Sequence, residues 1–351
     1  MFSPEQYRAL REGAGLVDRS DRGKLRLRGR DRRDYLQGLL TNDIAALTAG
    51  TGAYAALLTA QGRMISDMYV VETGDSVLLD VEPDVVDRVR DLLEQFVFSE
   101  DVQVSDETAC LSQIGVLGPA ASSIVARVLN ARPVDSLEIL QNRIERWHDS
   151  AVLIVRRDDL GAPGFELTID RARAESLKTA LQDAGAIPVD PSTTEITRIE
   201  AGRPRFHRDM TADTIPLEAG IEERAISLTK GCYVGQEIII RVLHRGHGRV
   251  ARRLVGFTFD PSAPVPSAAD RVRAGDRDIG ALTSAVWSPA LKRPIAMGYV
   301  HREFAEPSTV VDVVSGEVVL PATVSSMPFV PQAPASGSRS ARRQRVETPD
   351  R

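Results

Sequence analysis

The character of the sequence changes at Val250, and this change limits the folds that the chain can adopt. Before Val250, apolar runs typical of strands alternate with segments that carry apolar residues at helical spacing. After it, short strand-like runs are separated by turns rich in proline and glycine, with no convincing helical pattern. The first pattern predicts an α+β body over residues 1–249, and the second predicts a small β-barrel over residues 250–330.

The spacing of apolar residues also predicts individual elements of both parts. In the body it predicts a helix from Arg32, a hairpin of two strands (53–60 and 64–71), further strands at 76–81, 102–104 and 111–117, and a helix over 84–97. A looser second copy follows, with a helix after Pro119, strands at 151–155 and 165–169, and a helix over 171–183. The barrel strands are expected at 254–259, 279–283, 295–300, 309–314 and 317–321.

The last segment, residues 331–351, consists largely of proline, serine and arginine, so we expect a disordered tail. The chain has a net charge of −5, and its five arginines against two acids make the tail its basic part. A protein that binds nucleic acid through phosphate contacts usually has a basic body. We therefore expect no direct binding of nucleic acid.

Two cysteines, Cys110 and Cys232, allow at most one disulfide bond. The first residues lack the apolar core of a signal peptide, and no run approaches the ~20 apolar residues of a membrane helix. We therefore expect a cytoplasmic protein that does not enter a membrane and whose thiols are both free. Cys110 begins an apolar strand, which predicts a buried position in the core.

The densest group of chemically distinctive residues is the octapeptide Lys230-Gly231-Cys232-Tyr233-Val234-Gly235-Gln236-Glu237. A nearby ammonium group favours the thiolate form of a cysteine, which is the nucleophile and the metal ligand. This makes Cys232 a candidate reactive thiol and Lys230 its charge partner. Gln236 could bond to a polar heterocycle and Arg241 could hold a carboxylate. A buried, inert cysteine in a turn fits the same composition.

The octapeptide resembles the signature of the YgfZ family of folate-binding proteins, which are relatives of the aminomethyltransferase (T-protein) of the glycine cleavage system. Segments 37–43, 198–204, 215–220 and 280–289 resemble other parts of that family in the same order. The resemblance covers roughly residues 10–325. It implies a three-lobed, GcvT-like ring of two α+β lobes and a C-terminal β-barrel, with tetrahydrofolate or a derivative bound in the central opening.

The resemblance also implies roles for single residues. Glu200 stands in an Arg-x-Glu-x-Gly element similar to one that binds the pterin in the relatives, and a carboxylate can accept the paired donors of a pterin edge. Asp67 lies where the transferases keep an acid near the folate. Members of the YgfZ branch support the assembly or repair of iron–sulfur enzymes, including one that modifies tRNA. Such enzymes or their assembly proteins are therefore the implied partners.

Two departures from the transferases favour the YgfZ branch. The transferases carry two glycines and then two adjacent aspartates, whereas this chain has Gly62-Arg63-Met64-Ile65-Ser66-Asp67 with a single acid. The transferases also lack the Lys-x-Cys motif. A folate-dependent aminomethyltransferase remains the alternative function.

Cys232, His244 and His247 could supply three ligands to a zinc ion. The sequence offers no fourth ligand nearby, and histidines in a solvated loop fit the same spacing. We therefore expect no metal site.

Overall fold

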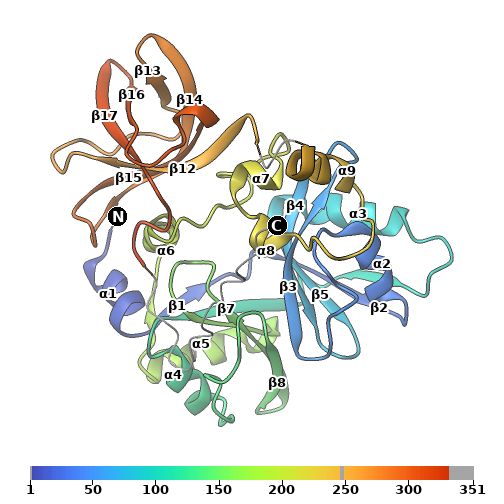
Figure 1. Ribbon diagram of the computed structural model, residues 1–351. Helices are drawn as coiled ribbons and strands as arrows, with labels where there is room; N and C mark the ends of the chain where they lie inside the picture. Colours follow the sequence, from blue (N-terminus) through green and yellow to red (C-terminus); the bar gives the residue numbers. More distant parts are fainter. Residues whose placement is uncertain (1, 246–248, 332–351) are drawn as a thin grey trace, which may run out of the picture.

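The computed structural model describes residues 2–245 and 249–331. Two sheets and a closed barrel surround a central region in which helix α6 (Pro191–Glu200) lies (Figure 1). The α+β fold with two lobes and a C-terminal barrel, expected from the sequence, is confirmed.

The first lobe is a five-stranded sheet in the order β3-β4-β5-β2-β6. Its apolar residues and those of two helices, α2 (Arg32–Leu39) and α3 (Val86–Gln95), form one buried core. Tyr35, on the first of these helices, donates its hydroxyl to the carbonyl of Leu93 on the second. The elements are β2 (Gly23–Arg28), α2 (Arg32–Leu39), β3 (Thr51–Leu58), β4 (Met64–Glu72), β5 (Val77–Val81), the short turn η1 (Pro83–Val85), α3 (Val86–Gln95) and β6 (Gln103–Asp106).

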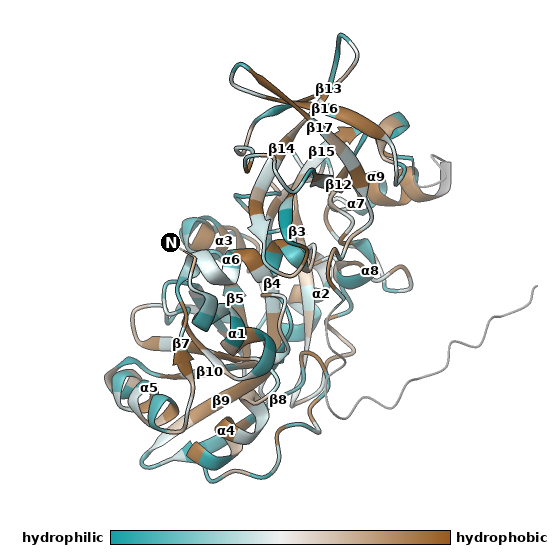
Figure 2. Ribbon diagram, turned by 90° about the vertical axis from the view of Figure 1, so that its left-hand side faces the viewer, coloured by the Kyte–Doolittle hydropathy of each residue, from teal (hydrophilic) through white to brown (hydrophobic). Residues whose placement is uncertain are grey.

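The second lobe is a six-stranded sheet in the order β11-β1-β7-β10-β9-β8, and it has its own core. Helices α4 and α5 pack on its strands, and strand β9 is largely hydrophobic (Figure 2). The elements are β1 (Gly15–Asp18), β7 (Leu111–Leu117), α4 (Ala121–Val128), β8 (Asn142–Trp147), β9 (Ser150–Arg157), β10 (Gly164–Asp170), η2 (Arg171–Arg173), α5 (Ala174–Asp183) and β11 (Ile187–Pro188).

The barrel closes in the order β12-β15-β14-β13-β16-β17 around a third apolar core. Each pair of neighbouring strands is antiparallel, so the closed sheet leaves no free edge. The strands are β12 (Arg252–Phe259), β13 (Arg271–Ala274), β14 (Arg277–Ser288), β15 (Arg293–His301), β16 (Val310–Ser315) and β17 (Val318–Ser325), with the turn η4 (Arg302–Phe304).

The remaining helices join the three parts. Helix α1 (Pro4–Glu12) is capped by the Ser3 side chain, which accepts from the Gln6 amide, and it packs against α6. Between α6 and the barrel lie α7 (Pro216–Ala219), α8 (Glu222–Ala225), α9 (Gln236–Ile240) and the π-helical turn η3 (Arg241–Arg245).

The chain crosses between the lobes at its start, because β1 belongs to the second sheet and β2 to the first. A small cluster of Val71, Leu78, Leu153 and Val155 packs between the two sheets. The two lobes are therefore interleaved in sequence and share an apolar contact. This places the turn between β1 and β2 in the central region, next to both sheets.

The predicted helices and strands are confirmed to within a few residues, but the prediction for Cys110 is wrong. Cys110 lies in the turn before β7 and is exposed. The free state of both thiols is confirmed.

Among the described residues, none of the helices is long and apolar enough to cross a membrane. His247 and residues 332–351, on which the zinc and tail predictions depend, lie outside the described residues.

Candidate functional site

A cavity lies where the two sheets meet α6, and it has a volume of about 140 Å³. Pockets that enclose whole drug-sized ligands are larger, roughly 300–1,000 Å³. The cavity can therefore enclose one ring system, with the rest of a longer ligand outside it. The residues that line it come from both lobes and α6; they include Arg19, Arg22, Tyr54, Asp67, Tyr69, Glu82, Asp159, Glu195, Arg198, Arg203, Arg205 and Arg224.

Asp67 reaches this cavity from the middle of β4; its role as an acid near the folate, which the resemblance implies, stays a prediction. Its Oδ2 accepts a hydrogen bond of 2.6 Å from the hydroxyl of Tyr54 on the neighbouring strand β3. Burial raises the pKa of Asp67, and the nearby Glu82 carboxylate adds to the rise, while the hydrogen bond from Tyr54 opposes it. Asp67 is therefore a carboxyl group that can hold a proton at a higher pH than an exposed aspartate.

Tyr54 is fixed from two sides. The guanidinium of Arg224 lies over its ring at 4.9 Å, and the ring of Tyr69 lies 5.0 Å away. Burial and the Asp67 carboxylate raise the pKa of Tyr54 well above its usual value. The hydroxyl therefore stays protonated and donates a hydrogen bond to Asp67. The aromatic rings and the carboxyl group together form a surface that suits a flat, polar heterocycle.

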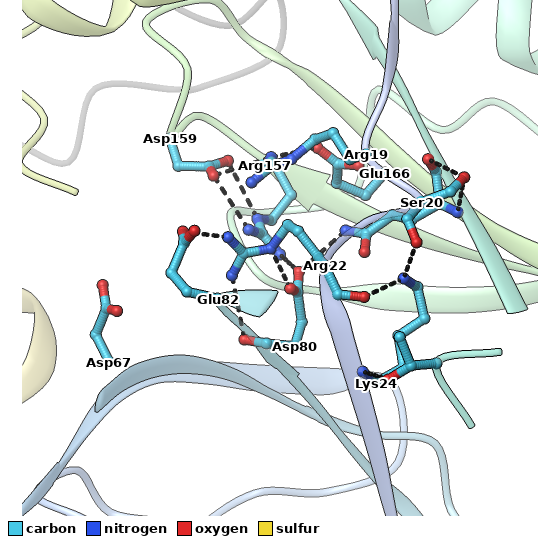
Figure 3. Close-up of polar contacts among 12 residues, drawn as sticks. Arg19, Ser20, Arg22, Lys24, Asp67, Asp80, Glu82, Arg157, Asp159 and Glu166 are labelled. Carbon is cyan, nitrogen blue, oxygen red and sulfur yellow. Dashed lines mark hydrogen bonds and ion pairs between the residues drawn. The ribbon is translucent and has the colours of Figure 1, made fainter. Parts of the chain in front are cut away.

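A buried network of charges lies beside Asp67, and its members Arg22, Glu82 and Asp159 line the cavity (Figure 3). Arg22 pairs with both Asp80 and Glu82, and Arg157 pairs with Asp80 at 3.0 Å and with Asp159 at 3.2 Å. Burial acts to raise the pKa of Asp80, but Arg22 and Arg157 outweigh it and hold that pKa well below its usual range. The network joins β5 of the first lobe to the end of β9 in the second, so it fixes the two lobes around the cavity.

Helix α6 contributes Glu195 and Arg198 to the cavity. Arg198 pairs with Glu195 at 2.6 Å and with the buried Asp209 at 2.7 Å, and it donates to Ser284 of the barrel at 3.0 Å. Burial tends to raise the pKa of Glu195, but Arg198 more than compensates and lowers it. A charged carboxylate therefore faces the cavity from α6, and its partner connects it to the barrel.

Glu200, predicted to contact the pterin, is not among the residues that line the cavity. Its fully buried carboxylate accepts from the Tyr7 hydroxyl at 2.8 Å and from Ser288 Oγ at 2.6 Å, and it pairs with Arg11. Glu195 and Glu200 are five residues apart, which is about 140° around an α-helix. The same helix therefore directs Glu195 to the cavity and Glu200 to the junction of α1 with the barrel.

Lys230 contacts backbone carbonyls in place of the predicted thiol. Its Nζ donates to the carbonyls of Gln37 and Leu40 at 2.6 Å and of Asn42 at 2.8 Å. Burial lowers the pKa of Lys230 to about 8, and the charge of Asp43 opposes the change. The ammonium thus fastens the octapeptide to the end of α2.

The other predicted residues of this segment, Cys232, Gln236 and Arg241, do not line the cavity. Cys232 is exposed in the loop before α9. Gln236 begins α9, and Arg241 forms a surface ion pair of 2.7 Å with Glu237 one helical turn earlier. Among the described residues, no group of three or more His, Cys, Asp or Glu side chains is placed to hold a metal ion.

Several cavity residues escaped the sequence analysis, although two of them carried a signal. Asp190-Pro191 is a typical start of a helix, and the helix that follows it would place Glu195 and Arg198, three residues apart, on one face. Tyr54, Asp159 and Arg224 carried no such signal, because only the packing of distant segments brings them together.

Comparisons with known proteins cover nearly the whole chain. Residues 2–230 match the GCVT N-terminal domain, and residues 252–331 match the glycine cleavage T-protein C-terminal barrel domain. The chain belongs to the GCVT family. A GCVT relative named aminomethyltransferase, from Chlorobium phaeovibrioides, is 30% identical over 93% of this chain and 90% of the relative. Another of that name, from Rubrobacter xylanophilus, is also 30% identical, over 95% and 89%.

The fold of a GCVT crystal structure agrees with this assignment. The glycine cleavage system aminomethyltransferase T from Bartonella henselae superposes with a TM-score of 0.85, covering 93% of this chain and 89% of that one, at 23% identity. The GcvT-like part of the sequence resemblance is thus confirmed. Its narrower assignment to the YgfZ branch of the GCVT family stays a prediction.

Proposed function

We propose that the chain binds a reduced folate, tetrahydrofolate or a derivative, with the pterin ring in the central cavity. The observation that carries the proposal is the Asp67 carboxyl, which faces a ring-sized cavity beside the rings of Tyr54 and Tyr69. A pterin edge presents amide and amino donors, which Asp67 and Glu195 could accept. Relatives across the GCVT family carry a name that denotes one-carbon chemistry, which supports the same ligand class.

The reaction that we propose first is aminomethyl transfer, the activity in the name of these relatives. Bound tetrahydrofolate would supply the amines that accept the one-carbon unit. Asp67 is suited to hold or release a proton beside such an amine, because burial raises its pKa. Tyr54 and Arg224 would orient Asp67 and restrict water near it.

Calorimetry with tetrahydrofolate tests the binding proposal. We expect the wild type to bind and Asp67→Asn to bind about tenfold or more weakly, because a charge-assisted hydrogen bond contributes roughly 1.5–3 kcal/mol. Cys232→Ser is the matched control and should bind as the wild type does, since Cys232 lies outside the cavity. A wild type that gives no heat of binding would contradict the proposal.

The transfer itself is tested with an aminomethylated carrier protein and tetrahydrofolate. One aminomethyl thioether and one tetrahydrofolate should give one free carrier thiol, one ammonia and one methylene-tetrahydrofolate. We expect Asp67→Asn to reduce the rate at saturating folate about a hundredfold, in the range of general acid–base catalysis. Folate binding without any release of ammonia would exclude this reaction and retain the binding role.

Support of iron–sulfur enzymes, as in the YgfZ branch, is the second candidate. It is favoured by the exposure of Cys232, in a motif that the transferases lack and none of whose residues lines the cavity. An exposed thiol in the cytoplasm could contact a client enzyme or an assembly protein. Cys232→Ser should then fail to complement a strain that lacks its own homologue. Cys110→Ser removes the other exposed thiol and should complement fully; rescue by Cys232→Ser would exclude the thiol role.

A further inference from the structure

We propose that Lys230 is a positioning residue for the central cavity, acting through Asn42 on Tyr54 and Arg224. The proposal rests on the proposed function, since it assigns Lys230 a part in holding the folate site. It joins two segments that the sequence analysis treated separately, the octapeptide and the Thr41-Asn42-Asp43 segment. The inference follows from a chain of hydrogen bonds between the surface loop and the cavity.

The first step lies at the end of α2. The last carbonyls of a helix have no partner within the helix and carry partial negative charge. The Lys230 ammonium donates to one of these terminal carbonyls, that of Gln37, and to the carbonyls of Leu40 and Asn42 just beyond the helix. The Val234 amide donates to the Gly38 carbonyl at 3.3 Å. The octapeptide therefore caps α2 and holds the segment that follows it.

The second step passes through Asn42. Its side-chain amide donates to the carbonyl of Tyr54 at 2.8 Å and to the carbonyl of Arg224 at 2.9 Å. Tyr54 and Arg224 both line the cavity, and the Tyr54 hydroxyl donates to Asp67. Asn42 therefore connects Lys230 to the backbone of both cavity residues, and Tyr54 extends this path to Asp67.

Thr41 strengthens the same connection. Its amide donates to the Ala56 carbonyl at 3.0 Å, and its hydroxyl accepts from the Ala56 amide at 2.9 Å. The hydroxyl also donates to the carbonyl of Ala225 at 2.6 Å, and its own carbonyl accepts from Ser227 at 3.1 Å. Thr41 and Asn42 together bind β3 to the end of α8, the two elements that carry Tyr54 and Arg224.

Lysine has the geometry that this position requires. Its ammonium is compact and presents three donors in different directions, which matches three carbonyls around one point. The ion pairs of the described residues do not include Lys230, so backbone carbonyls are its principal partners there. The ring of Tyr233, whose centroid lies 5.1 Å from Nζ, covers it. Methionine has a similar length and apolar stem but cannot donate.

The test compares Lys230→Met, Asn42→Ala and their combination with the wild type. We expect Lys230→Met to raise the tetrahydrofolate dissociation constant five- to tenfold, and Asn42→Ala to do the same. The double variant should lose no more than the larger single loss, because both residues act on one path. Cys232→Ser, in the same loop, is the control and should retain wild-type affinity.

Amide hydrogen exchange gives a second readout that needs no ligand. In Lys230→Met the amides of Thr41 and Ala56 should exchange at least tenfold faster, while amides of β14 and β15 in the barrel remain unchanged. If the wild type fails to bind tetrahydrofolate but this exchange accelerates, the proposed function fails and the positioning role stands. The inference would be overturned if the Thr41 and Ala56 amides of Lys230→Met exchanged at the wild-type rate. It would also be overturned if they exchanged faster while the variant bound tetrahydrofolate with wild-type affinity. If Lys230→Met does not fold, the affinity of Asn42→Ala decides.

Discussion

At the residue scale, the structure separates two acids that the sequence analysis paired. Asp67 faces the cavity, and within the described ranges Tyr54 is its one side-chain donor, whereas Glu200 accepts from Tyr7, Arg11 and Ser288. A carboxylate that accepts from three side chains in a buried junction has little capacity left for a ligand. The availability of a side chain, as well as its chemical type, decides whether it can serve a site.

The raised pKa of Asp67 makes a prediction about stability and pH. A carboxyl whose pKa is higher in the folded than in the unfolded chain favours folding when protonated, and this contribution is lost as the pH rises through the folded pKa. Asp67→Asn, which stays neutral, should therefore gain stability relative to the wild type as the pH rises from about 4 through the folded pKa of Asp67. Urea unfolding across this range measures it. Asp213→Asn, at an exposed carboxylate, is the control for the loss of one negative charge.

At the element scale, the octapeptide is a structural part of the first lobe. Its Tyr233 is buried in the core of that lobe, and its Gly235 has φ +83° and lies against the turn between β3 and β4. A Cβ atom on Gly235 would lie 2.5 Å from the Thr59 carbonyl oxygen. The second glycine of the motif is thus required by both its conformation and its packing.

Two glycines of the octapeptide allow a matched comparison. Gly235→Ala should destabilise the protein by about 1–3 kcal/mol, because it combines a left-handed conformation with a backbone clash. Gly231→Ala should change stability by no more than about 0.5 kcal/mol, since a Cβ there meets no atom within 4 Å. Thermal and urea unfolding of both variants measure the difference. Equal losses would contradict the assigned role of Gly235.

Much of the fold, but less of the site, could be predicted from the sequence. Local periodicity predicts elements such as β7 and α5, whereas Asp67 was proposed only through the resemblance to the aminomethyltransferases. The consecutive strands β1 and β2 belong to different sheets, and this assignment depends on long-range pairing, such as that of Gly15 with Leu117. The role of Lys230 depends on carbonyls some 190 positions away in the chain, and no local pattern reports such a contact.

At the scale of the whole molecule, the buried charges between the lobes replace a continuous apolar core. Arg22, Asp80, Arg157 and Asp159 connect the two sheets behind the cavity, with the apolar cluster around Val71 beside them. Buried ion pairs contribute little net stability when intact, but removing one partner leaves an uncompensated charge. The position of the lobes relative to each other therefore depends on all members of the network.

Asp80→Asn tests this dependence. The change leaves Arg22 and Arg157 without a charged partner on β5, and we expect a loss of about 3–5 kcal/mol in the free energy of unfolding at pH 7. Because the pKa of Asp80 is lowered by folding, its contribution is present above about pH 4 and declines as the pH falls further. The wild type should therefore lose stability faster than the variant below pH 4. Parallel acid titrations of both proteins would reveal the difference.

The junction at Glu200 has a consequence for engineering the chain. Its side chain holds helix α1, while its backbone carbonyl accepts from the amides of Phe329 and Val330 after the last barrel strand. Two segments from opposite ends of the described chain thus meet at one residue. A circular permutant that links them with a short flexible peptide and opens at Gly275, an exposed hairpin tip, should assemble normally. Deletion of residues 326–331 should weaken the contact of the barrel with α6 but retain the bonds of Arg198 to Ser284 and of Glu200 to Ser288.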